Sequence, residues 1–88
     1  MEVRHNEKES RFEIEVDGKL ATTWYRRHGD KIIFTHTEVP PELEGHGVGG
    51  ALARAALTYA RKEGLRVVPL CPFIAAFIER HKEFQDLV

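Results

Sequence analysis

The sequence predicts an α/β domain in which a three-stranded antiparallel meander precedes a helix, a strand and a second helix. Three observations support this prediction. Alternating apolar residues and turn signals divide residues 1–39 into three extended segments. Apolar residues then recur at helical spacing from Gly47 to Glu63. A short apolar run and a second helical pattern complete the chain. The predicted order is therefore β-β-β-α-β-α.

The three extended segments are RFEIEV, KLATTWYRR and KIIFTHTEV. The first alternates apolar residues with glutamates, which is typical of a half-buried strand. Asp17-Gly18 follows it and is a strong signal for a two-residue hairpin turn. A second turn is expected at residues 28–30, and Pro40-Pro41 closes the third segment. The first nine residues are polar, and we expect their tip to be frayed.

The helical half of the chain has recognisable boundaries. The apolar stripe of the first helix is Val48, Leu52, Ala56 and Tyr59/Ala60. Gly64 stands where a helix-terminating glycine belongs, with Arg61 and Lys62 in the last turn. The run LRVVPL is expected to be a short buried strand. Pro72 suits the first position of the last helix, whose predicted apolar side carries Phe73, Ile74, Phe77 and Ile78.

Composition limits the possible functions. The 88 residues predict a single domain spanning 1–88, with close to half apolar residues as in ordinary globular proteins. The formal charge of −1 argues against a nucleic-acid or membrane-surface partner. A single cysteine excludes an internal disulfide, so a cytoplasmic location is expected. The charged amino-terminal stretch has no signal-peptide pattern, and no apolar run is long enough to span a membrane.

A glycine-rich stretch, EGHGVGG, lies between the third predicted strand and the first helix. The first amides of a helix have no partner within it, and the helix dipole gives that end partial positive charge. Glycines would let a diphosphate approach these amides closely. The Gly-Lys-Ser/Thr of a nucleotide-hydrolysing P-loop is absent, and the chain is too short for a dinucleotide fold. A glycine turn without any ligand remains the alternative.

The stretch HTEVPPELEGHGVGGALARAALTYARKEGLRVVPLCPF resembles the core of the GNAT superfamily of acyl-CoA-dependent N-acyltransferases. The superfamily pattern, Gln/Arg-x-x-Gly-x-Gly/Ala, falls on residues 44–49. With CPFIAAFIERHKEF, the chain resembles a subfamily of very short, stand-alone GNAT-like proteins. The resemblance implies acetyl-CoA as cofactor. Its pyrophosphate would lie on the amides of His46, Gly47, Val48, Gly49 and Gly50, following Gly45. Its pantetheine would run along Thr37 to Val39.

Two departures from the superfamily pattern have consequences. Glu44 stands where Gln or Arg is usual, and because its carboxylate would repel a diphosphate we expect the side chain to point away. As an alternative role, Glu44 suits the positive end of the helix dipole. The two helices that normally follow the first strand have no counterpart. We therefore expect an open acceptor groove, suited to a large or exposed acceptor such as a protein amine.

Acetyl transfer to an amine requires a base, polarisation of the carbonyl and stabilisation of the departing thiolate. Cys71 precedes Pro72, so it is expected at the helix N-cap, where the dipole lowers a thiol pKa. It matches the position of the cysteine regarded as a catalytic candidate in the short subfamily. It could protonate the thiolate or accept the acetyl group, and the alternative is a buried apolar cysteine.

His36 is expected in phase with Ile32 and Phe34, as a general base or as a core histidine. Glu38 shares that phase and could share the role, or be a solvated carboxylate. His46 could contact a phosphate or be merely exposed. The histidines and the cysteine show no metal-ligand spacing.

The sequence thus predicts an acetyl-CoA-binding N-acetyltransferase that acts on an amine, by direct transfer or through Cys71. The alternative is a non-catalytic acyl-CoA-binding module that acts as a sensor or protein partner. No motif determines the oligomeric state.

Overall fold

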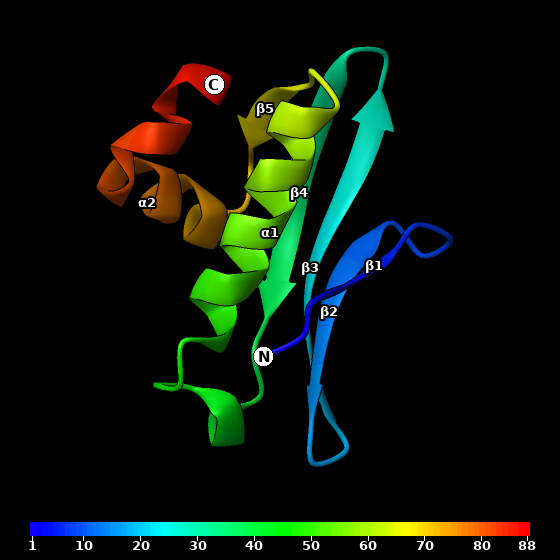
Figure 1. Ribbon diagram of the computed structural model, residues 1–88, viewed down its shortest axis with the longest axis vertical. Helices are drawn as coiled ribbons and strands as arrows, with labels where there is room; N and C mark the ends of the chain where they lie inside the picture. The colour runs from blue at the N-terminus through cyan, green and yellow to red at the C-terminus, as the bar shows by residue number, and fades with distance from the viewer.

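The computed structural model describes residues 1–88, which form one five-stranded sheet and two α-helices (Figure 1). The strands are β1 (Arg4–Asn6), β2 (Arg11–Val16), β3 (Lys19–His28), β4 (Lys31–Glu38) and β5 (Arg66–Pro69). The helices are α1 (Val48–Lys62) and α2 (Pro72–Arg80), with 3-10 turns η1 (Pro41–Leu43) and η2 (Lys82–Leu87). The strands lie in chain order, antiparallel except for β5, which is parallel to β4.

The α/β class is as predicted, but the prediction of a three-stranded meander was wrong because it omitted β1. This strand pairs with β2, with Arg4 opposite Glu13 and Asn6 opposite Arg11. Its three residues are polar and show no hydrophobic alternation. Side-chain hydrogen bonds hold it instead: Asn6 Nδ2 donates to Glu13 at 2.9 Å. Such a strand leaves no pattern that sequence periodicity can detect.

The predicted turns and helix ends are confirmed. Asp17 and Gly18 have φ values of 52° and 78°, as a two-residue hairpin turn of this kind requires. The end of α1 is closed by two backbone bonds, from the Gly64 amide to the Arg61 carbonyl and from the Leu65 amide to the Ala60 carbonyl. This pair of bonds is the Schellman arrangement, and it makes use of the left-handed φ of Gly64, 68°.

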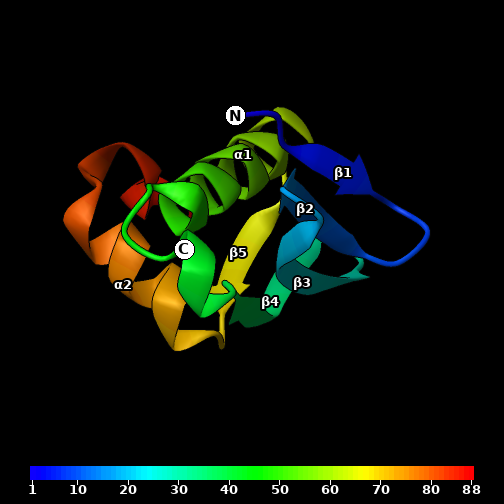
Figure 2. The same ribbon diagram turned by 90° about the horizontal axis from the view of Figure 1, so that it is seen from below.

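The hydrophobic core lies between α1 and one face of the sheet (Figure 2). Helix α1 follows the sheet diagonally, and α2 lies beside β5 at the sheet edge (Figures 1 and 2). The predicted stripe of α1 is buried apart from Tyr59, which is half-buried. Large side chains that are fully buried come from both layers: Ile14, Ile32, Phe34, Leu52, Leu57, Val67 and Ile74.

A bulge in β4 changes which residues face the core. Phe34 pairs with Tyr25 and His36 pairs with Trp24, so Thr35 has no partner of its own on β3. One unpaired residue reverses the alternation of side chains beyond it. Thr37 therefore faces the core side, where its hydroxyl lies 2.8 Å from that of Thr23. The expectation that His36 is in phase with Phe34 was wrong.

Candidate functional site

The glycine-rich loop leads from the end of β4 to an uncapped start of α1. Gly45 and Gly47 have φ values of 83° and 77°, a region that costs other residues about 1–2 kcal/mol. Gly47 is the N-cap, and no side chain caps the helix. The first helical hydrogen bond runs from the Ala51 amide to the Gly47 carbonyl over 3.0 Å. The amides of residues 48–50 therefore have no acceptor within the helix.

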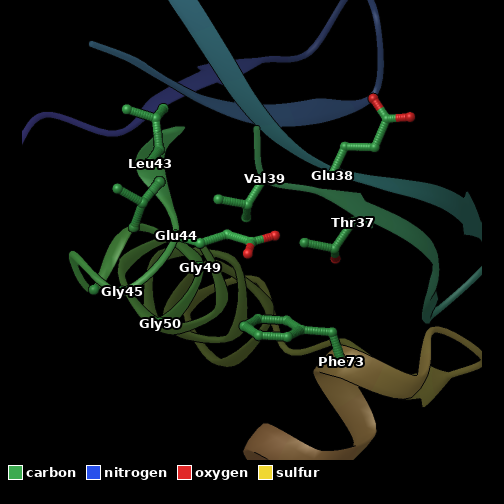
Figure 3. Close-up of a pocket in the computed structure, with 11 residues that line it drawn as sticks. Thr37, Glu38, Val39, Leu43, Glu44, Gly45, Gly49, Gly50 and Phe73 are labelled. Atoms are coloured by element: carbon green, nitrogen blue, oxygen red, sulfur yellow. The ribbon is translucent and has the colours of Figure 1, made fainter. Parts of the chain in front are cut away.

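These amides border a cavity of about 620 Å³ between the start of α1, the end of β4 and the start of α2 (Figure 3). Its walls include both the segment expected to bind pantetheine, Thr37 to Val39, and the glycine-rich loop expected to bind the pyrophosphate. The lining residues are Thr37, Glu38, Val39, Leu43, Glu44, Gly45, Gly47, Val48, Gly49, Gly50 and Phe73.

The ring of Phe73 lies against the first turn of α1. A Cβ atom built on Gly49 would come within 2.7 Å of its Cζ atom, which is closer than packing allows. Contact with the Phe73 ring therefore explains why a residue without a side chain is favourable at position 49. At Gly50 the nearest atom to such a Cβ is Cε2 of Phe77 at 3.8 Å, an ordinary contact. Packing within the chain therefore does not require a glycine at position 50.

Glu44 is placed differently from the expectation. Its carboxylate is directed into the cavity, above the Phe73 ring and toward Thr37 (Figure 3). The expectation that this side chain points away was wrong. The backbone of Glu44 is extended, with φ and ψ of −67° and 146°, between η1 and the turn at Gly45.

His36 and Glu38 lie together on the face of β4 that points away from α1. His36 Nε2 is 3.2 Å from the Glu38 carboxylate, and their side chains are 57% and 70% exposed. His36 does not line the cavity, whereas Glu38 does. The Glu38 carboxylate is directed away from Glu44 and Phe73 (Figure 3), so the His36–Glu38 pair faces the exposed side of β4.

Cys71 is the N-cap of α2, as expected, and is 3% exposed. Its sulfur lies 3.3 Å from the Thr37 hydroxyl. Its amide donates to the Phe34 carbonyl over 2.9 Å, which fixes the cysteine beside β4 just past the last β4–β5 pair. Cys71 does not line the cavity itself, and Thr37 stands between the thiol and the cavity.

His46 does not line this cavity either. Its exposed side chain borders a smaller depression of about 290 Å³ beside the β2–β3 turn, together with Glu42 and Asp17. Val48 lines both depressions, and the expected contact of His46 with a phosphate stays a prediction.

Sequence reasoning left three lining residues out of the site: Leu43, Glu44 and Phe73. Phe73 was assigned to the apolar side of α2, but its side chain is 36% exposed. Its position two residues after the N-cap was the available signal, because a residue there can face the neighbouring loop.

Two other features of the structure bear on function. No group of three or more His, Cys, Asp or Glu side chains is arranged to hold a metal ion. Neither helix combines the length and apolar character needed to cross a bilayer.

Both the sequence and the fold of this chain are similar to those of known proteins. The sequence model of the GCN5-related N-acetyl-transferase family matches residues 11–87. Among solved structures, the chain is similar to a GCN5-like protein from Staphylococcus aureus whose structure was determined in solution. The identity is 32%, the TM-score is 0.78, and the match covers 98% of this chain and 85% of that one. No curated protein matches the chain.

Proposed function

Because the chain belongs to the GCN5-related N-acetyltransferase family, we propose that it binds acetyl-CoA in the 620 Å³ cavity and transfers the acetyl group to an amine. The observation that carries this proposal is the junction of three uncapped helix amides with the exposed end of a strand. Amides 48–50 suit the diphosphate, and the Thr37–Val39 edge suits the amide-bearing pantetheine arm.

Gly50 supports the same proposal from a different direction. A glycine in a helix interior is less stable than alanine by about 0.5–1 kcal/mol, and no neighbour excludes a Cβ at this position. Close approach by a ligand would account for the missing side chain.

The residues around Thr37 suggest how protons move during transfer. The amine nitrogen bonds to the acetyl carbon, the carbon–sulfur bond breaks, and the sulfur leaves as a thiolate that needs a proton. The Cys71 thiol can supply that proton through the Thr37 hydroxyl, 3.3 Å away. The amine proton passes to water and from there to Glu38, which is paired with His36 on the exposed face of β4. The 3% exposure of Cys71 favours this proton-donating role over a covalent acetyl carrier.

A pair of variants at Gly50 tests the binding site. Asp and Asn have nearly the same shape, and Asp in a helical first turn is favourable for folding. The Gly50→Asp carboxylate would repel a diphosphate from amides 48–50. We expect calorimetric titration to give an acetyl-CoA affinity at least about tenfold weaker for Gly50→Asp than for Gly50→Asn. Equal affinities, or no heat with the wild type, would contradict the proposal.

Turnover tests the role of Cys71. We expect Cys71→Ala to slow release of coenzyme A with an amine acceptor by about 10²-fold, the scale of general acid catalysis, with acetyl-CoA affinity unchanged. Intact-mass measurement after incubation with acetyl-CoA alone separates the two mechanisms. If the wild-type protein gains one acetyl group and Cys71→Ala gains none, the acetyl group is carried covalently by Cys71, and the proton-donating role is wrong.

A second candidate is a binding module without turnover. The exposure of His36 and Glu38 favours it, because a base in contact with bulk water is weakly positioned. A panel of amines, including peptide amines that suit an open acceptor groove, distinguishes the two. If the release of coenzyme A never exceeds the rate of acetyl-CoA hydrolysis with any amine, the protein is a binding module without turnover.

A further inference from the structure

The lining of the cavity includes two glutamates and no cationic residue, but only Glu44 directs its carboxylate into the cavity (Figure 3). Glu38 and Glu44 are its only charged lining residues. Glu38 has a partner in His36, but no ion pair and no side-chain hydrogen bond involves Glu44. The Glu44 carboxylate is directed into the cavity between the loop and Thr37 (Figure 3). Its negative charge therefore has no neighbouring side chain to neutralise it.

A diphosphate in this cavity would be both attracted and repelled by charges of the protein. The amides and dipole of α1 attract it, while the Glu44 carboxylate, which precedes the same loop, repels it. The pantetheine arm of an acyl donor is uncharged and does not feel this repulsion. Glu44 thus acts on one half of the donor only.

No side-chain contact requires a carboxylate at position 44. Glu44 is exposed, and it makes no side-chain bond that stabilises the loop. Its backbone amide bonds to the Pro41 carbonyl over 3.2 Å, a contact that any non-proline residue would keep. Changing the charge at position 44 should therefore leave the loop in place.

We propose that Glu44 is a specificity-determining residue that penalises the diphosphate and makes the site select its donor mainly by the acyl-pantetheine arm. This inference rests on the proposed function. Its consequence is a substrate class: the wild-type site discriminates little between acetyl-CoA and acetyl-pantetheine thioesters that carry fewer phosphate charges. Removing the carboxylate restores a preference for the diphosphate.

Calorimetric titration with two probes, acetyl-CoA and S-acetylpantetheine, tests this assignment. We expect Glu44→Gln to bind acetyl-CoA about two- to fivefold more tightly than the wild type, the order of magnitude by which one unit charge within several ångströms affects another in water. Glu44→Arg should increase the gain further. Affinity for S-acetylpantetheine should stay within about twofold in every variant, since that probe has no phosphate.

Glu42→Gln is the matched control. Glu42 lies two residues earlier, outside the cavity, and its carboxylate is 3.7 Å from Lys19 Nζ. This variant removes the same charge from the same loop, and its affinities should equal those of the wild type. A gain at Glu42→Gln equal to that at Glu44→Gln would overturn the assignment, because it would show a general charge effect.

The outcomes also separate this inference from the proposed function. If the wild type binds acetyl-CoA and Glu44→Gln leaves the ratio of the two affinities unchanged, the role of Glu44 is wrong and the proposed function stands. If the wild type shows no binding of acetyl-CoA, the proposed function is wrong, and this inference falls with it whatever Glu44→Arg does. If neither probe binds to any variant, both fall.

Discussion

Gly49 and Gly50 are neighbours in the first turn of α1, yet only at position 49 would a Cβ collide with a neighbouring side chain. A Cβ at position 49 would meet the Phe73 ring at 2.7 Å, whereas one at position 50 would meet Phe77 at 3.8 Å. Neither glycine has a positive φ, so backbone strain does not distinguish them. The difference between the two positions is therefore one of space alone.

This difference predicts opposite behaviour for two alanine variants. Gly50→Ala should raise the free energy of unfolding by about 0.5–1 kcal/mol, because alanine is the better helix former. Gly49→Ala should lose that gain, because the new methyl group must displace Phe73. Urea unfolding of both variants in the absence of ligand measures the contrast. Equal stabilisation of the two would show that Phe73 moves freely and does not constrain position 49.

The phase of β4 is another property that depends on a single residue. The unpaired Thr35 turns Thr37 toward Cys71 and His36 away from the core. Without the bulge, His36 would point inward and the Thr37 hydroxyl outward. The polar contact between Thr37 and the thiol thus exists because one strand carries one extra residue.

At the scale of elements, β1 is held to the sheet by polar and aromatic side chains. The His5 ring stacks on Phe12 with centroids 4.1 Å apart, and its Nε2 lies 2.6 Å from the Tyr25 hydroxyl. Burial lowers the pKa of His5 below its usual value, partly offset by Glu7. Burial also raises the pKa of Tyr25.

The lowered His5 pKa predicts that acid weakens the fold. Below about pH 6.5 the unfolded chain binds a proton at His5 more readily than the folded chain, so stability falls as pH falls through this value. The urea midpoint should therefore drop between about pH 8 and pH 5.5. His5→Phe keeps an aromatic ring but cannot be protonated, so its midpoint should drop less. Parallel pH dependence in both proteins would exclude His5 as the source.

Glu13 also makes the stability of the fold fall on acidification, but at a lower pH than His5. It is 5% exposed and accepts hydrogen bonds from Asn6 and Arg11, which, with Arg11 and Arg4 as neighbouring charges, lower its pKa. Stability from a depressed carboxyl pKa is complete above the ordinary value and is lost on acidification below it. The His5 comparison above about pH 5.5 therefore avoids this second titration.

At the scale of the whole molecule, the cavity lies where three elements separate. The pairing of β4 with β5 ends at Phe34 and Pro69, after which the two chains diverge toward η1 and α2. Helix α1 begins opposite this divergence (Figure 1). The opening is consequently a property of the parallel β4–α1–β5 unit, and the loop and α2 add its specific side chains.

The carboxyl-terminal turn closes the other end of the helical layer. Phe84 and Leu87 of η2 are buried, and Arg61 of α1 binds the Asp86 carboxylate at 2.7 Å. Aromatic contacts join Phe77 of α2 to Phe84, with centroids 6.2 Å apart. These contacts tie α1 and α2 together, so the start of α2, with Phe73 and Cys71, is held in position against the start of α1.

The sequence by itself determined the α/β class, the turn at Asp17-Gly18, the extent of α1 and the N-cap position of Cys71. Each depends on contacts between residues that are close in the chain: hairpin dihedrals, helical periodicity and the fixed φ of Pro72. It also indicated the glycine loop as an anion site, which stays a prediction here.

Tertiary structure alone decided three other features. Strand β1 depends on hydrogen bonds to Glu13, seven residues away in sequence from Asn6. The direction of His36 depends on a bulge that forms only when β4 pairs with β3. The place of Glu44 in the wall of the cavity depends on where the end of β4, η1 and the start of α2 meet, elements that are far apart in the sequence from Thr37 to Phe73. In each case the determining partner lies on another element, and local propensity contains no information about it.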